Sequence, residues 1–124
     1  MNVAPRSRVL PTPHLKLVRP PRRIDLCELD AIPLGQGRAF VIDDHAVAVF
    51  RQRDGLVFAI DNVCPHRGGP LAEGIAGGGS VICPLHGWKI DLRSGRCAAE
   101  DKGVRTYPVE IVGARIWLTI EADK

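Results

Sequence analysis

The sequence of 124 residues lacks several features that mark large classes of protein. It has no apolar run near the ~20 residues of a membrane-spanning helix, and its beginning has no apolar core like that of a signal peptide. It also lacks the glycine fingerprint of a dinucleotide-binding site. We therefore expect a soluble protein without a membrane span that does not itself bind a nicotinamide cofactor.

Cysteine is also scarce, since the chain has only Cys27, Cys64, Cys83 and Cys97. Their number and spacing do not form the disulfide framework of a small secreted protein, so we expect a reducing compartment and a cytoplasmic location. A chain of this length is one domain that can bury a modest core without disulfides. Cys27 and Cys97 match no ligand spacing, so we interpret them as small, partly buried residues.

Residues 1–24 lack acidic side chains altogether. Their basic residues and prolines are Arg6, Arg8, Lys16, Arg19, Arg22, Arg23, Pro5, Pro11, Pro13, Pro20 and Pro21. Proline removes amide donors and disfavours helix, so this segment is interpreted as a disordered tail that precedes a folded domain over residues 25–124. No aromatic residue interleaves the charges, so no specific nucleic-acid site is expected.

No segment keeps a 3.6-residue period over three helical turns, which predicts an all-β fold. Predicted strands cover residues 24–28, 38–42, 46–51, 56–60, 89–92, 104–112 and 115–120. Hairpin turns are expected at Asp43-Asp44-His45 and at Arg53-Asp54-Gly55. The architecture should be an antiparallel sandwich or small barrel, with Trp117 in its core.

Residues 62–95 interrupt the strand pattern and are interpreted as a loop-rich subdomain, because glycine and proline are concentrated there. Two short motifs in it each carry one thiol and one imidazole, namely Cys64-Pro65-His66 and Cys83-Pro84-Leu85-His86. Both groups are common metal ligands. The sequence therefore predicts a metal centre held by Cys64, His66, Cys83 and His86.

Two kinds of centre are compatible with these four ligands. A structural zinc site uses two cysteines and two histidines, but its usual ligand spacings are longer than that of Cys64 and His66. A binuclear iron–sulfur centre explains why each loop carries one ligand of each kind, because each loop then spans both irons. One iron would take the two cysteines and the other the two histidines. A zinc-stabilised binding module is the alternative.

The stretches Cys64-Pro65-His66-Arg67-Gly68-Gly69 and Cys83-Pro84-Leu85-His86-Gly87-Trp88 resemble the Rieske iron–sulfur family. The resemblance implies a Rieske-type 2Fe-2S cluster at the tip of an all-β domain, and the role of a one-electron carrier. Within the family, the chain is most similar to the small subunits of assimilatory NAD(P)H-dependent nitrite reductases, through residues 66–71, 88–95 and 104–109. That implies a subunit without catalytic residues, whose larger flavin and sirohaem partner reduces nitrite to ammonium.

A second role within the family is that of a free-standing ferredoxin that feeds a ring-hydroxylating oxygenase. The high-potential members resemble one another in having a disulfide between the two loops, and the corresponding positions here are Gly69 and Leu85. The resemblance therefore implies a potential near the low end of the range of about −150 to +300 mV for such centres. We expect the electron acceptor to dock at the exposed edge of His66 and His86.

Overall fold

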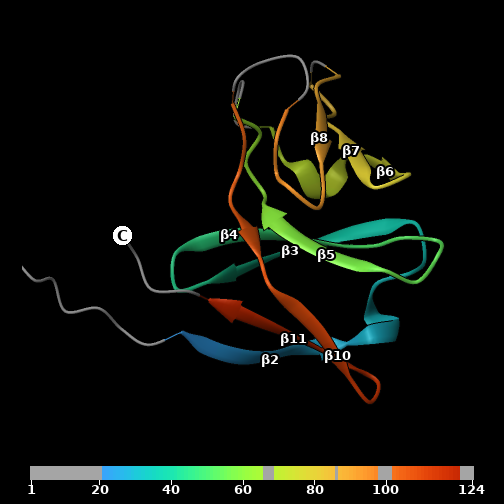
Figure 1. Cartoon of the computed structure of the whole chain (residues 1–124), viewed down its shortest axis with the longest axis vertical. Coiled ribbons are helices and arrows are strands. Elements are labelled where there is room, and N and C mark those ends of the chain that lie inside the picture. The colour runs from blue at the N-terminus through green and yellow to red at the C-terminus, as the bar shows by residue number, and fades with distance from the viewer. Residues whose placement is uncertain (1–20, 66–68, 86, 98–101, 121–124) are drawn as a thin grey trace, which may run out of the picture.

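The computed structural model describes residues 21–65, 69–85, 87–97 and 102–120 (Figure 1). Strands dominate these residues, and all strand pairs are antiparallel, which confirms the all-β fold. The strands are β2 (Arg22–Glu28), β3 (Gln36–Ile42), β4 (His45–Arg51), β5 (Val57–Asp61), β6 (Ile75–Gly77), β7 (Ser80–Ile82), β8 (Lys89–Asp91), β9 (Thr106–Tyr107), β10 (Val109–Val112) and β11 (Arg115–Ile120). Two short 3-10 turns, η1 (Leu29–Ala31) and η2 (Leu71–Glu73), connect them. The described residues include no helix that could cross a membrane.

Three sheets lie on one another as layers (Figure 1). The middle layer has the strand order β3-β4-β5-β9, and the order of the outer layer is β10-β11-β2. A small third sheet, β6-β7-β8, covers the opposite side of the middle layer. We call the first two sheets the base, and the third sheet with its adjoining loops the loop subdomain.

Strand β4 contributes to two separate hydrophobic cores, because successive side chains of a strand point to opposite faces of the sheet. The core of the base contains Ile32, Val47, Val49, Ala59, Tyr107, Ile116, Leu118 and Ile120. The core of the loop subdomain contains Ala48, Phe50, Ile60, Cys64, Leu71, Val81, Cys83, Ile90, Leu92 and Cys97. Residues 47–50 are therefore all fully buried, and β4 joins the two halves of the molecule.

The loop subdomain contains a hairpin that the sequence interpretation missed, although the third strand of its sheet, β8, was predicted. Strands β6 and β7 are joined by a two-residue turn of Gly78 and Gly79, whose φ angles are 59° and 84°. The turn lies between Gly77 and Ser80, which are the last paired residues of the two strands. A tight hairpin turn of this kind needs positive φ at both central residues, which glycine adopts without strain. The glycines that were interpreted as part of an irregular loop thus form the turn of a hairpin. Its two strands are too short to show an alternating pattern in the sequence.

Two predicted strand boundaries were also wrong. Strand β2 begins at Arg22 and not at Ile24, so the last residues of the predicted tail pair with β11, while residues 1–20 lie outside the described residues. The predicted strand over residues 104–112 is divided at Pro108, which has no N–H for a strand ladder. Strand β9 before it joins the middle sheet, and β10 after it joins the outer sheet. The predicted turn at Asp43 and Asp44 is confirmed, with φ angles of 49° and 69°.

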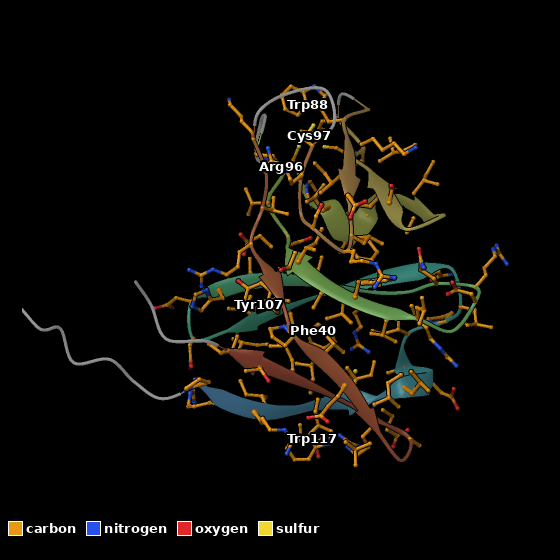
Figure 2. The ribbon with its side chains drawn as sticks, viewed as in Figure 1. Phe40, Trp88, Arg96, Cys97, Tyr107 and Trp117 are labelled. Atoms are coloured by element: carbon orange, nitrogen blue, oxygen red, sulfur yellow. The ribbon has the colours of Figure 1, made fainter. Side chains whose placement is uncertain are left out.

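Trp117 is not in the core, contrary to the prediction. Its neighbours on β11, Ile116 and Leu118, are fully buried, so the alternation of the strand directs Trp117 to the outer face of the base (Figure 2). There the guanidinium of Arg23 lies 4.7 Å from the centre of the indole ring. The alternation of residues along β11 correctly predicted that every second side chain is buried. Which face of the strand is buried depends on how the sheets pack, and this was not visible in the sequence.

Candidate metal centre

Two loops that carry the predicted ligands rise from the ends of β5 and β7. The first loop follows Asp61 and is closed where the N–H of Cys64 donates to the carbonyl oxygen of Gly69 at 2.9 Å. The second follows Ile82, and the N–H of Cys83 donates to the carbonyl oxygen of Trp88 at 2.7 Å. In each loop the cysteine amide thus bonds to the residue five positions later. Both loops are therefore closed by the same type of hydrogen bond, although the spacing of the predicted ligands differs between them.

The structure brings Cys64 and Cys83 into the same core. Each has only 2% of its surface exposed, and both belong to the core of the loop subdomain. The loops also contact each other directly, because a Cβ atom at Gly69 in the first loop would lie 3.0 Å from Sγ of Cys83 in the second. Thiols from two adjacent loops form a soft donor pair that suits iron or zinc.

The other two predicted ligands, His66 and His86, lie outside the described residues, as does Arg67. Within the part of the chain that the structure describes, no group of three or more metal-binding side chains is found. The described donors nevertheless fit a Rieske-type centre, in which two cysteines hold one iron and two histidines hold the other. A pair of cysteines, one from each loop, is the donor set that the first iron requires.

Asp61 and Asn62 anchor the first loop, and sequence reasoning missed both. The side-chain oxygen Oδ1 of Asn62 accepts a bond from the N–H of Ala72 at 2.7 Å, and its carbonyl oxygen accepts one from the N–H of Leu71 at 2.9 Å. These two bonds join the start of the first loop to η2, which follows the end of that loop. An amide side chain two residues before a Cys-Pro motif was the available signal, but its partner is ten residues away in the chain.

Asp61 ties the same loop to the base. Its Oδ1 accepts a hydrogen bond from the hydroxyl of Tyr107 at 2.6 Å, and its Oδ2 accepts one from the N–H of Arg105 at 3.0 Å. Burial and the neighbouring Asp61 carboxylate raise the pKa of Tyr107 well above its ordinary value. The Tyr107 hydroxyl also lies 3.4 Å from Nδ1 of His45, and the two rings pack edge to face.

Two further side chains anchor the β6–β7 hairpin and the turn that follows β8. Gln52 is a buried polar residue with 6% exposure, and its Oε1 accepts a bond from the N–H of Gly79 at 2.6 Å. Asp91 accepts bonds at 2.8 Å from the N–H groups of Arg93 and Ser94. These bonds, with that from Ser94 contributing most, lower the pKa of Asp91. Both side chains thus have partners within the fold.

The other two cysteines lie in different halves of the molecule. Cys97 is buried in the core of the loop subdomain, whereas Cys27 is half-buried on β2. Trp88 packs partly buried against the same core as Cys97, and Figure 2 shows both at the end of the molecule opposite Trp117. A cleft of about 550 Å³ lies elsewhere, between the β4–β5 turn and the β6–β7 hairpin.

Comparison with protein families identifies one match over most of the chain. The sequence profile of the Rieske [2Fe-2S] domain matches residues 22–108. A solved structure from Mycobacterium tuberculosis, assigned as the small subunit of an NADH-dependent nitrite reductase, is similar with a TM-score of 0.77 and 31% identity. The similarity covers 83% of this chain and 98% of the mycobacterial chain.

Curated relatives include proteins of more than one redox system. The ferredoxin component of a naphthalene 1,2-dioxygenase system from Pseudomonas aeruginosa is 31% identical over 78% of this chain and 94% of its own length. The large subunit of a nitrite reductase [NAD(P)H] from Klebsiella oxytoca is 36% identical over 75% of this chain, but over only 10% of its own length. The chain likewise spans 22% of a 4beta-methylsterol monooxygenase from Methylococcus capsulatus.

Proposed function

The chain belongs to the Rieske [2Fe-2S] domain family, and from that premise we propose that it is the electron-transfer subunit of an NAD(P)H-dependent nitrite reductase. A larger partner with flavin and sirohaem would reduce nitrite to ammonium, in the cytoplasm and as part of nitrate assimilation. The observation that carries this proposal is the nearly end-to-end similarity to the mycobacterial small subunit. The family also makes the alternative of a zinc-stabilised binding module untenable.

We assign Cys64 and Cys83 to one iron of the cluster and His66 and His86 to the other. When bound, such a cluster takes up and releases one electron at a time. The buried positions of both thiols support the assignment, because burial excludes water from the ligand sulfurs. In each loop the backbone N–H of the cysteine also holds the loop closed, which supports a fixed backbone around both thiols.

The partner is expected to dock at the tip of the loops, near His66 and His86. Two apolar residues beside the ligand cysteines support this site, because Val63 is 49% exposed and Leu85 is 54% exposed. Exposed apolar side chains next to a redox centre are suited to a contact that excludes water from the path of the electron. Flavin or iron–sulfur donors with low potentials would match a centre without a disulfide between its loops.

A second candidate is a ferredoxin that serves a ring-hydroxylating oxygenase. It is favoured by the dioxygenase ferredoxin component, which this chain matches over 94% of that protein's length. The two candidates share the cluster and differ in the protein that takes the electron. Copurification therefore discriminates them, since a tagged protein would bring down either a sirohaem reductase or an oxygenase. The neighbouring coding sequences offer an independent observation.

Deletion of the coding sequence tests the proposal directly. We expect growth on nitrite as the only nitrogen source to be lost, while growth on ammonium is unchanged. The wild-type chain and the Cys27→Ser variant should restore growth, because Cys27 lies in the base, whereas Cys83→Ser should not. Unimpaired growth of the deletion strain on nitrite would overturn the nitrite reductase role, and a simultaneous loss of growth on aromatic compounds would support the ferredoxin role.

A further inference from the structure

Gly69 and Leu85 meet where the two loops touch. Gly69 is buried at the end of the first loop, and Leu85 lies in the second loop with 54% of its surface exposed. A Cβ atom at position 69 would lie 3.0 Å from Sγ of Cys83 and 3.0 Å from both Cγ and Cδ1 of Leu85. Carbon atoms pack best at about 3.5–4.0 Å. The Leu85 side chain therefore already fills the space that a side chain at position 69 would need.

The Leu85 side chain and the Cys83 sulfur border the same point beside Gly69, where the two loops meet. Cys83 has only 2% exposure, although Leu85 two residues later is half exposed. The outer part of Leu85 is thus in water, and its inner part lies against the backbone that borders the sulfur. A half-exposed leucine would cost little if it were removed from an ordinary surface. Here its removal would open a direct route for water to Cys83.

We propose that Leu85 is a positioning residue, which clamps the second loop onto Gly69 and excludes water from the Cys83 sulfur, and so holds the reduction potential of the cluster low. The inference rests on the ligand assignment of the proposed function, but not on the identity of the redox partner. Reduction adds negative charge to the centre, and water near the sulfurs stabilises that charge. Opening the contact should therefore raise the potential.

Three variants at position 85 test the shielding in the cluster-loaded protein. We expect Leu85→Ala to raise the equilibrium constant for reduction several-fold, where tenfold corresponds to 59 mV for a one-electron couple. Leu85→Met conserves the volume and should keep the wild-type potential, and Leu85→Val should give an intermediate shift. Leu85→Val also provides the measurement if Leu85→Ala does not retain the cluster. The readouts are the potential by protein-film voltammetry and the rate of iron loss to a chelator.

Ile75→Ala is the matched control, because Ile75 is an equally apolar side chain of the loop subdomain and is 75% exposed. It should leave the potential and the rate of iron loss unchanged. A partner-docking role alone would leave the potential of every position-85 variant at the wild-type value, and that result would overturn the proposal. A shift of equal size in Ile75→Ala would overturn it as well.

The contact between the loops can be tested by a cross-link. A cysteine sulfur in place of Cγ of Leu85 would lie about 3 Å from the Cβ of residue 69, which is the separation found in a disulfide. The cluster-loaded variant Gly69→Cys with Leu85→Cys should therefore form this bridge on mild oxidation, as mapped by mass spectrometry of its peptides. The pair Gly69→Cys with Ile75→Cys is the control and should remain unbridged. A double variant that keeps its cluster and resists bridging would refute the clamp.

The measurements also separate this inference from the proposed function. A purified protein without acid-labile sulfide would refute both. A protein with a full cluster, normal copurification of a sirohaem reductase and an unchanged potential in Leu85→Ala and Leu85→Val would refute the role of Leu85 alone.

Discussion

The base and the loop subdomain share strand β4 but are held together in different ways. The base has strands of up to seven residues, such as β3 and β4, in continuous ladders. Each strand of the loop subdomain has three residues, and side chains such as Asn62 and Gln52 close its loops. Short ladders contribute little stability by themselves. We therefore expect the base to fold without metal, whereas the loop subdomain needs the bound metal centre in order to fold.

The largest effect is expected from Cys83→Ser, which removes a ligand thiolate. We expect complete loss of the cluster and faster hydrogen exchange of the β7 and β8 amides, while the β4 and β5 amides keep their protection. Iron and acid-labile sulfide analysis, together with hydrogen exchange followed by mass spectrometry, would check both parts. Cys27→Ser in the base is the control and should keep the cluster. Equal loss of protection in both halves would break the distinction between them.

Phe50→Ala should have the next largest effect, because it acts on the strand that both halves share. Phe50 is fully buried in the core of the loop subdomain, and its ring lies over Gly37 of β3, where a Cβ atom would be 2.6 Å from the ring. Removing such a ring should cost about 3–5 kcal/mol of unfolding free energy. Urea denaturation would measure it, with the 79% exposed Val41→Ala as a control that changes little.

The sequence predicted the parts of the fold that depend on local patterns. β-branched runs predicted β4 and β11, and Asp43-Asp44 predicted a tight turn. The two cysteines of the centre were also predicted to lie together, because their loops carry recognisable motifs. The strands and the turn need only neighbouring residues, whereas the meeting of the two cysteines was inferred from their shared motif type.

The features that were missed depend on contacts between distant residues. The hydroxyl of Tyr107 bonds to Asp61 across 46 positions of sequence, and no local pattern encodes that pairing. The outward direction of Trp117 depends on which sheet covers β11. The β6–β7 hairpin was missed for another reason, since its strands of three residues are too short for an alternating pattern to be recognised.

Tyr107→Phe should have an intermediate effect, because it removes the bond that ties the first loop to the base. Loss of the hydroxyl leaves Oδ1 of Asp61 without this donor, at a cost of about 1–3 kcal/mol near pH 7. The folded state raises the pKa of Tyr107, so an unfolded chain loses this proton first, near its ordinary pKa of about 10. The stabilisation is complete below that pH and is lost as the pH rises above it.

Denaturation between pH 7 and pH 11 would measure this linkage. The wild type should lose unfolding free energy more steeply above pH 10 than Tyr107→Phe does. Parallel curves for the two proteins would show that Tyr107 titrates alike in the folded and unfolded states. Asp61→Asn serves as the partner variant, and its effect should not add fully to that of Tyr107→Phe, because both remove the same bond.

The smallest effect is expected from Arg23→Ala on the outer face of the base. Arg23 pairs with Glu110 at 2.6 Å and stacks on Trp117, but its side chain is 52% exposed, so solvent screens the pair. We expect a loss of about 0.5 kcal/mol of unfolding free energy, which high salt should reduce further. The cluster potential should be unchanged, because the base separates this charge from the loops. A shifted potential would show that charges of the outer sheet reach the centre, and the two halves would then be coupled electrostatically as well as through β4.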